Sequence, residues 1–164
     1  MSFDLRPARP EDVGELLALI RDLAVFEELT HLLEVDEERL AAGLFGPRPH
    51  AEAILAWPRS GSARAAGFAL YFHNFSTFLG KPGLYLEDLF VRPEARRQGC
   101  ATALLRELAG IAIARGCGRF EWSVLDWNVD AQAFYAKIGA NLLPDWRITR
   151  MTGDALATFA AATD

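Results

Sequence analysis

The sequence predicts an α/β fold of the α+β sandwich type, and three observations predict it. Segments with strand-like runs of apolar residues alternate with segments whose apolar residues recur at helical spacing. The first half contains two neighbouring strands separated by only a short turn, which is typical of a β-hairpin. The 164 residues, 51% of them hydrophobic, suit one domain with a full core. We therefore expect residues 1–164 to form a single domain.

The first half of the chain contains three predicted strands and two predicted helices. Residues 2–6 are a short strand. A helix follows over residues 10–28, because Pro10 and two acids occupy its first turn and its apolar stripe runs from Val13 to Ala24. Residues 36–44 are a second helix, ended near Gly46. Residues 51–57 and 65–75 are strands joined by a turn over residues 58–62.

The second half continues with a third long strand over residues 84–91. A strong helix follows over residues 99–115, where six apolar residues from Ala101 to Ala112 lie on one face. Residues 119–125 are a strand, and residues 129–138 are a helix that ends at Gly139. We expect a last strand over residues 146–151 and a short helix from Gly153 onward.

Composition argues against several classes of protein. A net charge of −5 is not typical of a nucleic-acid-binding protein. Charged residues interrupt every long apolar run, so we expect no membrane partner, and the polar N-terminus is unlike a signal peptide. Cys100 and Cys117 form no C-x-x-C pair and few histidines could complete a metal site, so we expect no metal. A cytoplasmic protein with two reduced thiols is the expectation.

The segment from Leu84 to Ala103 is the most informative for function. A buried strand runs through a turn containing Arg92, Arg96 and Arg97 into a helix that begins at Gly99. The unpaired N–H groups at a helix N-terminus bind anions, a glycine allows close backbone approach, and arginine suits phosphate. The alternative is a plain strand–turn–helix connection with solvated arginines.

This segment resembles the acetyl-CoA-binding motif of the GNAT superfamily of N-acetyltransferases, and the similarity to one subfamily extends along the chain. The pattern Q/R-x-x-G-x-G/A appears as Arg96 to Ala101. The subfamily comprises the diamine (spermidine/spermine) and thialysine N-acetyltransferases. Its other matching segments are Arg6 to Ala8, Leu19 to Glu27, Gly43 to Gly46, Tyr85 to Val91, Val124 to Asn128, Phe134 to Ala140, and Trp146.

The resemblance implies a GNAT fold, with a central mixed, mainly antiparallel sheet that is splayed and carries helices on both faces. It also implies acetyl-CoA as cosubstrate and a homodimer. Arg92 or Arg96 is implied for the 3′-phosphate, with the choice left open. The implied acetyl-CoA contacts are the strand residues Leu89, Phe90 and Val91, the loop and helix residues Arg96, Arg97, Gln98, Gly99, Cys100, Ala101 and Thr102, and also Asn128 and Tyr135.

The resemblance implies two catalytic residues. Tyr135 is implied as the general acid that protonates the departing thiolate, whereas its pattern alone favours a core tyrosine. Glu87 is implied as the group that holds the substrate ammonium and accepts its proton, directly or through water. Glu87 and Asp88 stand in an apolar strand, so only one should face the cleft, and a salt bridge to an arginine is the alternative for both.

The substrate-binding residues implied are Phe26, Glu27, Glu87 and Asp88. A solvated helix end is an equal alternative for Glu27. Polyamine-selective relatives carry further acids where this chain has Thr30, His31 and Ser76. We therefore expect a small amine, thialysine- or lysine-like or a diamine, with direct attack in a ternary complex. Alternatives are a polyamine acetyltransferase, a protein lysine or N-terminal acetyltransferase, and a non-catalytic acetyl-CoA-binding module.

Overall fold

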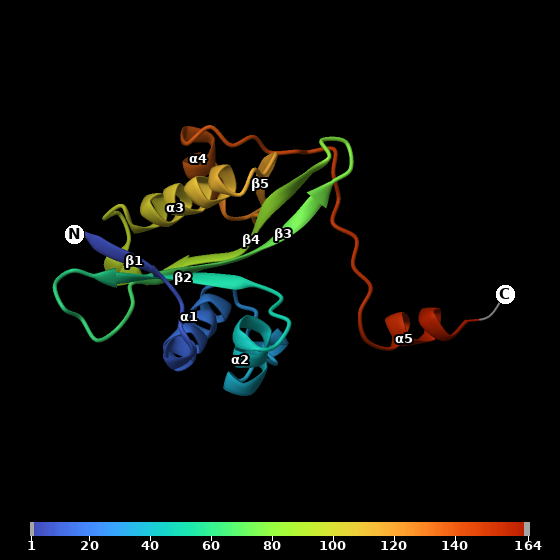
Figure 1. The fold of residues 1–164 in the computed structure, drawn as a ribbon, viewed down its shortest axis with the longest axis horizontal. Helices are drawn as coiled ribbons and strands as arrows, with labels where there is room; N and C mark the ends of the chain where they lie inside the picture. The colour runs from blue at the N-terminus through green and yellow to red at the C-terminus, as the bar shows by residue number, and fades with distance from the viewer. Residues whose placement is uncertain (1, 163–164) are drawn as a thin grey trace. The chain divides into compact units, whose positions relative to one another are not determined.

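The computed structural model describes residues 2–162, which form two compact units, one up to Ser123 and one from Val124 onward. The first unit contains all five strands and three α-helices (Figure 1). Its strands are β1 (Phe3–Pro7), β2 (Glu52–Pro58), β3 (Gly67–Ser76), β4 (Lys81–Val91) and β5 (Arg119–Trp122). Its α-helices are α1 (Val13–Phe26), α2 (Glu37–Phe45) and α3 (Cys100–Ala114), and the second unit contains α4 (Val129–Lys137) and α5 (Gly153–Ala161).

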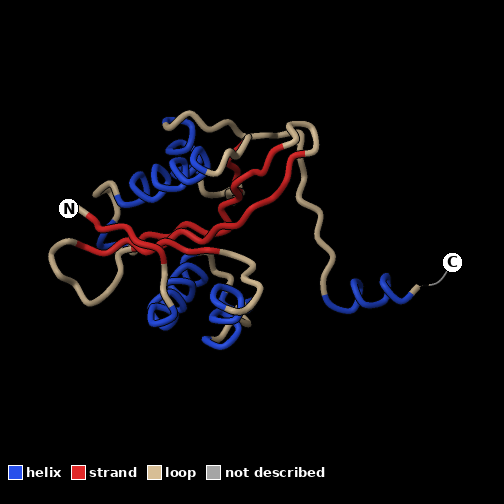
Figure 2. The backbone as a smooth tube through the Cα atoms, viewed as in Figure 1, coloured by secondary structure: helices blue, strands red, loops and turns tan. Residues whose placement is uncertain are grey.

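The strands form one open sheet in the order β1-β2-β3-β4-β5 (Figure 2). The first four are antiparallel to their neighbours, while β5 runs parallel to β4 because α3 forms the crossover between them. The prediction of a mixed, mainly antiparallel sheet is confirmed. β5 pairs with β4 over its whole length, from Gly83 to Leu86, and β4 continues beyond the end of β5.

Helices cover both faces of this sheet, as predicted. Figure 1 shows α1 and α2 against one face and α3 against the other. Leucines of α1 and α2 pack with Leu55, Phe68 and Phe90 in one buried cluster. On α3, Leu104 and Leu108 are fully buried. The helical stripes read from the sequence are thus the core-facing surfaces of these helices.

Element boundaries differ from the predictions at a few places. The predicted helix from Pro10 is divided into a 3-10 turn, Pro10–Asp12, and α1. The buried Asp12 carboxylate accepts two hydrogen bonds from Arg6 (2.6 and 2.8 Å) and one from the Arg9 N–H (2.8 Å). The predicted strand over residues 146–151 is wrong, because that segment has no regular secondary structure.

The second unit consists of α4, α5 and the chain between them. The side chain of Asn128 caps α4 by accepting a hydrogen bond from the Ala131 N–H (3.2 Å). Gly139 follows α4 with a φ of 92°, a left-handed conformation that ends helices. Across residues 2–162, no helix is long and apolar enough to cross a membrane.

Candidate active site

A β-bulge lies in the middle of β4, at the two adjacent acids. Leu70 of β3 pairs with Asp88, but the next residue, Tyr71, pairs with Leu86. Glu87 is therefore an extra residue with no partner in the β3–β4 ladder. A bulge breaks the regular alternation of side chains and bends the strand locally. The bulge thus separates β4 into two parts whose side chains follow different alternations.

The bulge determines which face of the sheet carries Asp88. Without it, Leu86, Asp88 and Phe90 would all share one face. Instead, Leu86 pairs with Tyr71, whose ring lies 5.9 Å from the Arg115 guanidinium at the end of α3. Asp88 pairs with Leu70, which packs against the α1–α2 core together with Phe90. Asp88 therefore faces the side of the sheet covered by α1 and α2.

The carboxylate of Asp88 experiences the negative charges of two other acids, Glu27 and Glu87, in this region. Burial raises the pKa of Asp88 to about 6, with further contributions from the negative charges of Glu87 and Glu27. Burial also raises the pKa of Glu27, which follows the last turn of α1. No salt bridge between residues 2 and 162 involves any of the three. Among the described residues, the salt-bridge alternative for Glu87 and Asp88 therefore has no arginine partner.

The raised pKa of Asp88 predicts a pH-dependent stability. Compared with the unfolded chain, the folded state disfavours the ionised form of the Asp88 carboxylate. The resulting loss of folding stability is absent below pH 4 and complete above about pH 6. Asp88→Asn should therefore raise the free energy of unfolding at pH 8 by about 1–3 kcal/mol. The gain should shrink as the pH falls from 6 to 4. Urea denaturation at several pH values measures it, with the exposed Asp145→Asn as control. If the free energy of unfolding had the same pH dependence in wild type and in Asp88→Asn, the raised pKa of Asp88 would be refuted.

Beyond Leu86, β4 has an edge that no strand covers on the β5 side among the described residues. This edge includes Leu89, Phe90 and Val91. The Val91 carbonyl accepts a hydrogen bond from Arg96 Nε (2.9 Å). The Arg96 guanidinium also lies over the rings of Phe26 (4.6 Å) and Phe90 (5.7 Å). Arg96 thus connects the end of the open edge to the end of α1.

The loop after β4 presents backbone N–H groups at the start of α3. Arg97 and Gly99 both have a left-handed backbone, with φ of 58° and 85°. Gln98 Nε2 donates to the Glu94 carbonyl (2.7 Å), and Gly99 is the N-cap of α3 without a side-chain cap. The first N–H groups of α3, from Cys100 to Thr102, therefore point out of the helix without helical partners. Burial raises the pKa of the Cys100 thiol to about 11, which makes it a poor nucleophile.

Gly99→Val tests this loop. An added Cβ at residue 99 would meet no atom within 4 Å. The substitution is therefore unfavourable because of the backbone φ of 85° and not because of crowding. Valine disfavours that conformation by roughly 1–2 kcal/mol, and the loop should change shape. We expect an about tenfold weaker affinity for CoA by calorimetry. Gly116→Val is the matched control, because Gly116 has a φ of 68° and equal space but follows the other end of α3. An unchanged CoA affinity in folded Gly99→Val would contradict a role of this loop in binding CoA.

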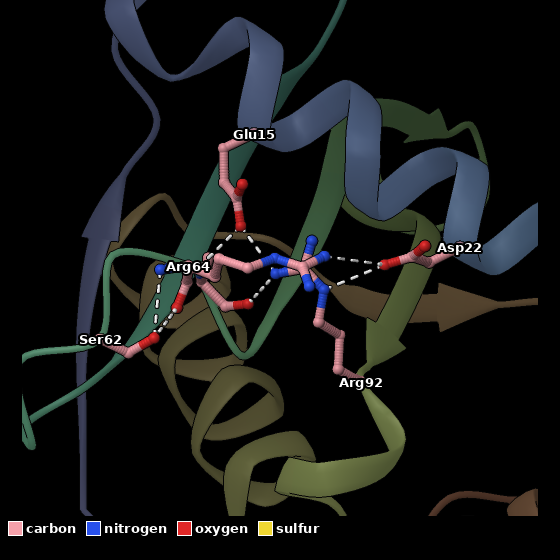
Figure 3. Close-up of polar contacts among 6 residues, drawn as sticks. Glu15, Asp22, Ser62, Arg64 and Arg92 are labelled. Carbon is pink, nitrogen blue, oxygen red and sulfur yellow. Dashed lines mark hydrogen bonds and ion pairs between the residues drawn. The ribbon is translucent and has the colours of Figure 1, made fainter.

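Arg92 has a different role from its neighbours. Its guanidinium is buried and donates to Glu15 Oε1 (2.7 Å), Asp22 Oδ2 (3.0 Å) and the Ala65 carbonyl (2.5 Å) (Figure 3). Glu15 Oε1 also accepts the Ala65 N–H (2.8 Å). Through these hydrogen bonds, Arg92 links α1 to the end of β4 and to the segment before β3. A contact from Arg92 to a phosphate of CoA is excluded, because its side chain is only 3% exposed.

The remaining candidate residues, Asn128 and Tyr135, lie in the second unit. Asn128 caps α4, and Tyr135 is half-buried on the same helix, with its ring 5.6 Å from that of Phe134. Burial raises the pKa of the Tyr135 hydroxyl, so it stays protonated over a wider pH range. A tyrosine in this state is suited to donating a proton.

The structure thus brings together several of the predicted residues within the first unit. The ring centroids of Phe26 and Phe90 lie 6.4 Å apart, and the charges of Glu27 and Glu87 act on Asp88. The open edge of β4 continues into the loop before α3. Sequence reasoning missed the bulge at Glu87 and the partners of Arg92. Neither had a signal in the sequence, since both depend on residues distant along the chain.

Comparisons with known proteins all indicate the same family. The sequence model of the Acetyltransferase (GNAT) family matches residues 15–140. The chain is similar to thialysine N-epsilon-acetyltransferase of Mus musculus, with 37% identity over 97% of this chain and 98% of that protein. It is also similar to L-ornithine N5-acetyltransferase NATA1 of Arabidopsis thaliana, with 36% identity over 93% of this chain and 85% of that protein.

Solved structures with the same fold are also known. An integron cassette protein from the mobile metagenome of V. cholerae superimposes with a TM-score of 0.81 at 27% sequence identity. The superposition covers 99% of this chain and 99% of that one.

Proposed function

Because this chain belongs to the GNAT acetyltransferase family, we propose that it transfers the acetyl group of acetyl-CoA to a small amine by direct attack in a ternary complex. The chain is an acetyltransferase, and relatives that act on thialysine and on ornithine support small amines as its substrates. We propose a thialysine- or lysine-like amine or a diamine for this chain.

The observation that carries this proposal is the group formed by Glu27, Glu87 and Asp88. These carboxylates carry no ion-pair partner within residues 2–162, although Asp88 is half-buried and repelled by the other two. A substrate ammonium would supply the missing positive charge. At about 4 Å and an effective dielectric constant near 20, such a pair gains on the order of 4 kcal/mol before desolvation.

The proposed reaction moves three protons. An alkylamine attacks only when neutral, so Glu87, directly or through water, accepts one proton of the bound ammonium. The amine nitrogen then bonds to the acetyl carbon and releases a second proton to solvent as the carbon–sulfur bond breaks. The departing thiolate takes a proton from the hydroxyl of Tyr135, which solvent then reprotonates. Asp88, ionised above about pH 6, holds the cationic substrate beside Glu87.

The residues proposed for acetyl-CoA fit an extended chain that ends in phosphates. The open edge of β4 from Leu89 to Val91 offers backbone groups to the pantetheine amides. The left-handed loop and the N–H groups at the start of α3 suit the pyrophosphate. Arg96 already donates to Val91 and stacks on two rings, so its proposed role is to hold this edge in place.

A compact substrate fits better than a long polycation. Thr30 and His31 lie in an exposed 3-10 turn and carry no negative charge. Ser76 is buried, and its hydroxyl accepts the Leu79 N–H (3.3 Å). None of the three replaces the extra acids that a tri- or tetra-cation needs, so the outer ammonium groups of spermine would lose water without compensation.

The function is tested by acetylation of an amine panel at pH 8 with mass detection of products. The panel contains thialysine, lysine, ornithine, putrescine, spermidine and spermine, and kcat/KM is compared across it. We expect the highest value for one of the small amines. A kcat/KM for spermine above all small amines would return the chain to the polyamine alternative, and release of CoA only with protein substrates would favour a protein acetyltransferase.

We further propose a cytoplasmic homodimer. Several large apolar side chains in the second unit are strongly exposed in the single chain, among them Trp146 at 76%, Ile148 at 73% and Phe159 at 71%. Exposed apolar side chains at this density are typical of an interface. Both cysteines are free thiols, in keeping with a reducing compartment. Sedimentation showing only monomer at micromolar concentration would contradict the dimer.

A further inference from the structure

Arg96 contacts both the edge proposed for acetyl-CoA and the end of α1. Its Nε donates to the carbonyl of Val91, at the end of the open edge of β4 (2.9 Å). Its guanidinium lies 4.6 Å from the centroid of the Phe26 ring, and Phe26 is the last residue of α1. The same guanidinium lies 5.7 Å from the centroid of the Phe90 ring. Arg96 therefore joins the edge of β4 to the helix end that immediately precedes Glu27.

The backbone of Arg96 belongs to the loop proposed for the pyrophosphate. A short 3-10 turn, Pro93–Ala95, comes immediately before it, and the Arg96 N–H donates to the Pro93 carbonyl (3.2 Å). Arg97, the next residue, has the left-handed φ of 58° that shapes the loop. A ligand that fixes this loop therefore also fixes the point from which the Arg96 side chain extends.

The last turn of α1 is less well packed than the rest of the helix. Leu23 is buried, but Phe26, three residues later, is 39% exposed. Exposed helix ends open more readily than core segments. The contact between Arg96 and the Phe26 ring therefore contributes to holding the end of α1, and with it Glu27, in position.

An arginine suits this place because one guanidinium can serve both neighbours. Its flat face stacks on aromatic rings, while its N–H groups donate within the plane. A lysine keeps the positive charge and can still attract a phosphate, but it has neither the flat face nor the fork of donors. Arg96→Lys therefore distinguishes a link between the two sites from a simple phosphate ligand.

We propose that Arg96 is a positioning residue that couples the two binding sites. Acetyl-CoA bound along β4 and in the loop fixes Arg96, and Arg96 holds Phe26 and Glu27 in the arrangement that binds the amine. The proposal rests on the acetyltransferase function proposed above. Coupling between two ligands is reciprocal, so the amine should raise the affinity for acetyl-CoA by the same factor.

Amide hydrogen exchange, with CoA as the probe, tests this coupling without an amine. The amides to follow are those of Glu27 and Leu29. Their N–H groups donate to the carbonyls of Leu23 (2.9 Å) and Ala24 (2.8 Å) at the end of α1. In wild type, saturating CoA should slow their exchange about two- to fivefold, the effect expected of an exposed cation–π contact. In Arg96→Lys, CoA should still bind, but the slowing should be lost.

Arg97→Lys is the matched control, because Arg97 is exposed and lies in the same loop. Exchange is compared at saturating CoA, so a change in CoA affinity does not affect the comparison. The slowing at Glu27 and Leu29 should persist in this variant. Its loss in both variants would show that the loop as a whole carries the effect, and would overturn the role of the Arg96 side chain.

A double-mutant cycle between Arg96 and Phe26 is the second test. Initial rates are measured with acetyl-CoA and with the amine of the panel that has the highest kcat/KM. Arg96→Lys and Phe26→Leu should each raise KM for the amine about two- to fivefold, and KM for acetyl-CoA less. The double variant should show no more than the larger single effect, because both changes remove the same contact. Multiplicative effects would contradict the coupling.

The outcomes separate this proposal from the function on which it rests. CoA binding to wild type without slower exchange at the end of α1, or an effect of Arg96→Lys on KM for acetyl-CoA alone, would overturn the coupling and leave the acetyltransferase function intact. Slower exchange with CoA but no acetylation of any amine in the panel would overturn the function and not the link from the loop to α1. If Arg96→Lys does not fold, Phe26→Leu should lose the slowing in the same way.

Discussion

Replacing Tyr135 by phenylalanine is expected to lower kcat with a good amine substrate by about 10²–10⁴-fold. The substitution keeps the ring that packs beside Phe134 and removes only the hydroxyl. Without that proton donor, the thiolate must leave unprotonated, and negative charge develops on sulfur without stabilisation. KM should change much less than kcat, because the donated proton matters in the transition state and not in substrate binding.

The pH profile of wild type follows from the same residue. Burial raises the pKa of Tyr135, so its proton is present at all pH values below that raised pKa and lost as the pH rises through it. The rate should therefore increase with pH as the amine loses its proton, up to about pH 10. A decline should begin only above that value.

Tyr85→Phe is the control for Tyr135→Phe. The Tyr85 hydroxyl has a hydrogen bond to the Ser123 hydroxyl (2.9 Å) in an exposed position of the first unit. Its removal should change kcat less than about fivefold, because this hydroxyl is assigned to no proton transfer and a lost neutral hydrogen bond is worth about 1 kcal/mol. A kcat for Tyr135→Phe within a few-fold of wild type would instead support the interpretation of Tyr135 as a core tyrosine.

Replacing Arg92 by methionine is expected to lower the free energy of unfolding by about 3 kcal/mol. Methionine fills most of the space but leaves Glu15, Asp22 and the Ala65 carbonyl without their shared donor. The loss lies at the lower end of the range for buried ion pairs, because the Asp22 side chain is 43% exposed and can be hydrated. Urea denaturation at pH 7 measures the change.

Arg64→Met provides the comparison for Arg92→Met. Arg64 lies 3.8 Å from the same Asp22 carboxylate, but its side chain is 62% exposed (Figure 3). An exposed ion pair contributes about 0–1 kcal/mol, so this variant should lose little stability. Equal destabilisation by the two substitutions would show that the buried network does not fasten α1 to the end of β4.

Local sequence patterns predicted most of the secondary structure because helices and strands have characteristic periods. The stripe of α3 and the acids after Pro10 were sufficient to place two helices to within three residues at either end. The error at residues 146–151 arose because strand formation does not depend on local sequence alone. A run containing Trp146 and Ile148 has strand propensity, but a strand also requires a partner, and propensity alone does not supply one.

The sequence by itself determined the fold class, the order of the elements up to α4 and the family to which the chain belongs, because periodicity and motifs are local properties. Only the tertiary structure decided the chemistry of individual side chains. Arg92 and Glu15 are 77 residues apart in sequence. Their contact shows that Arg92, a candidate phosphate ligand from the sequence, is a buried structural residue. Likewise, one extra residue at Glu87 determines the face on which Asp88 lies, and it becomes visible only when β4 is paired with β3. Burial, register and charge coupling depend on residues that meet only after folding.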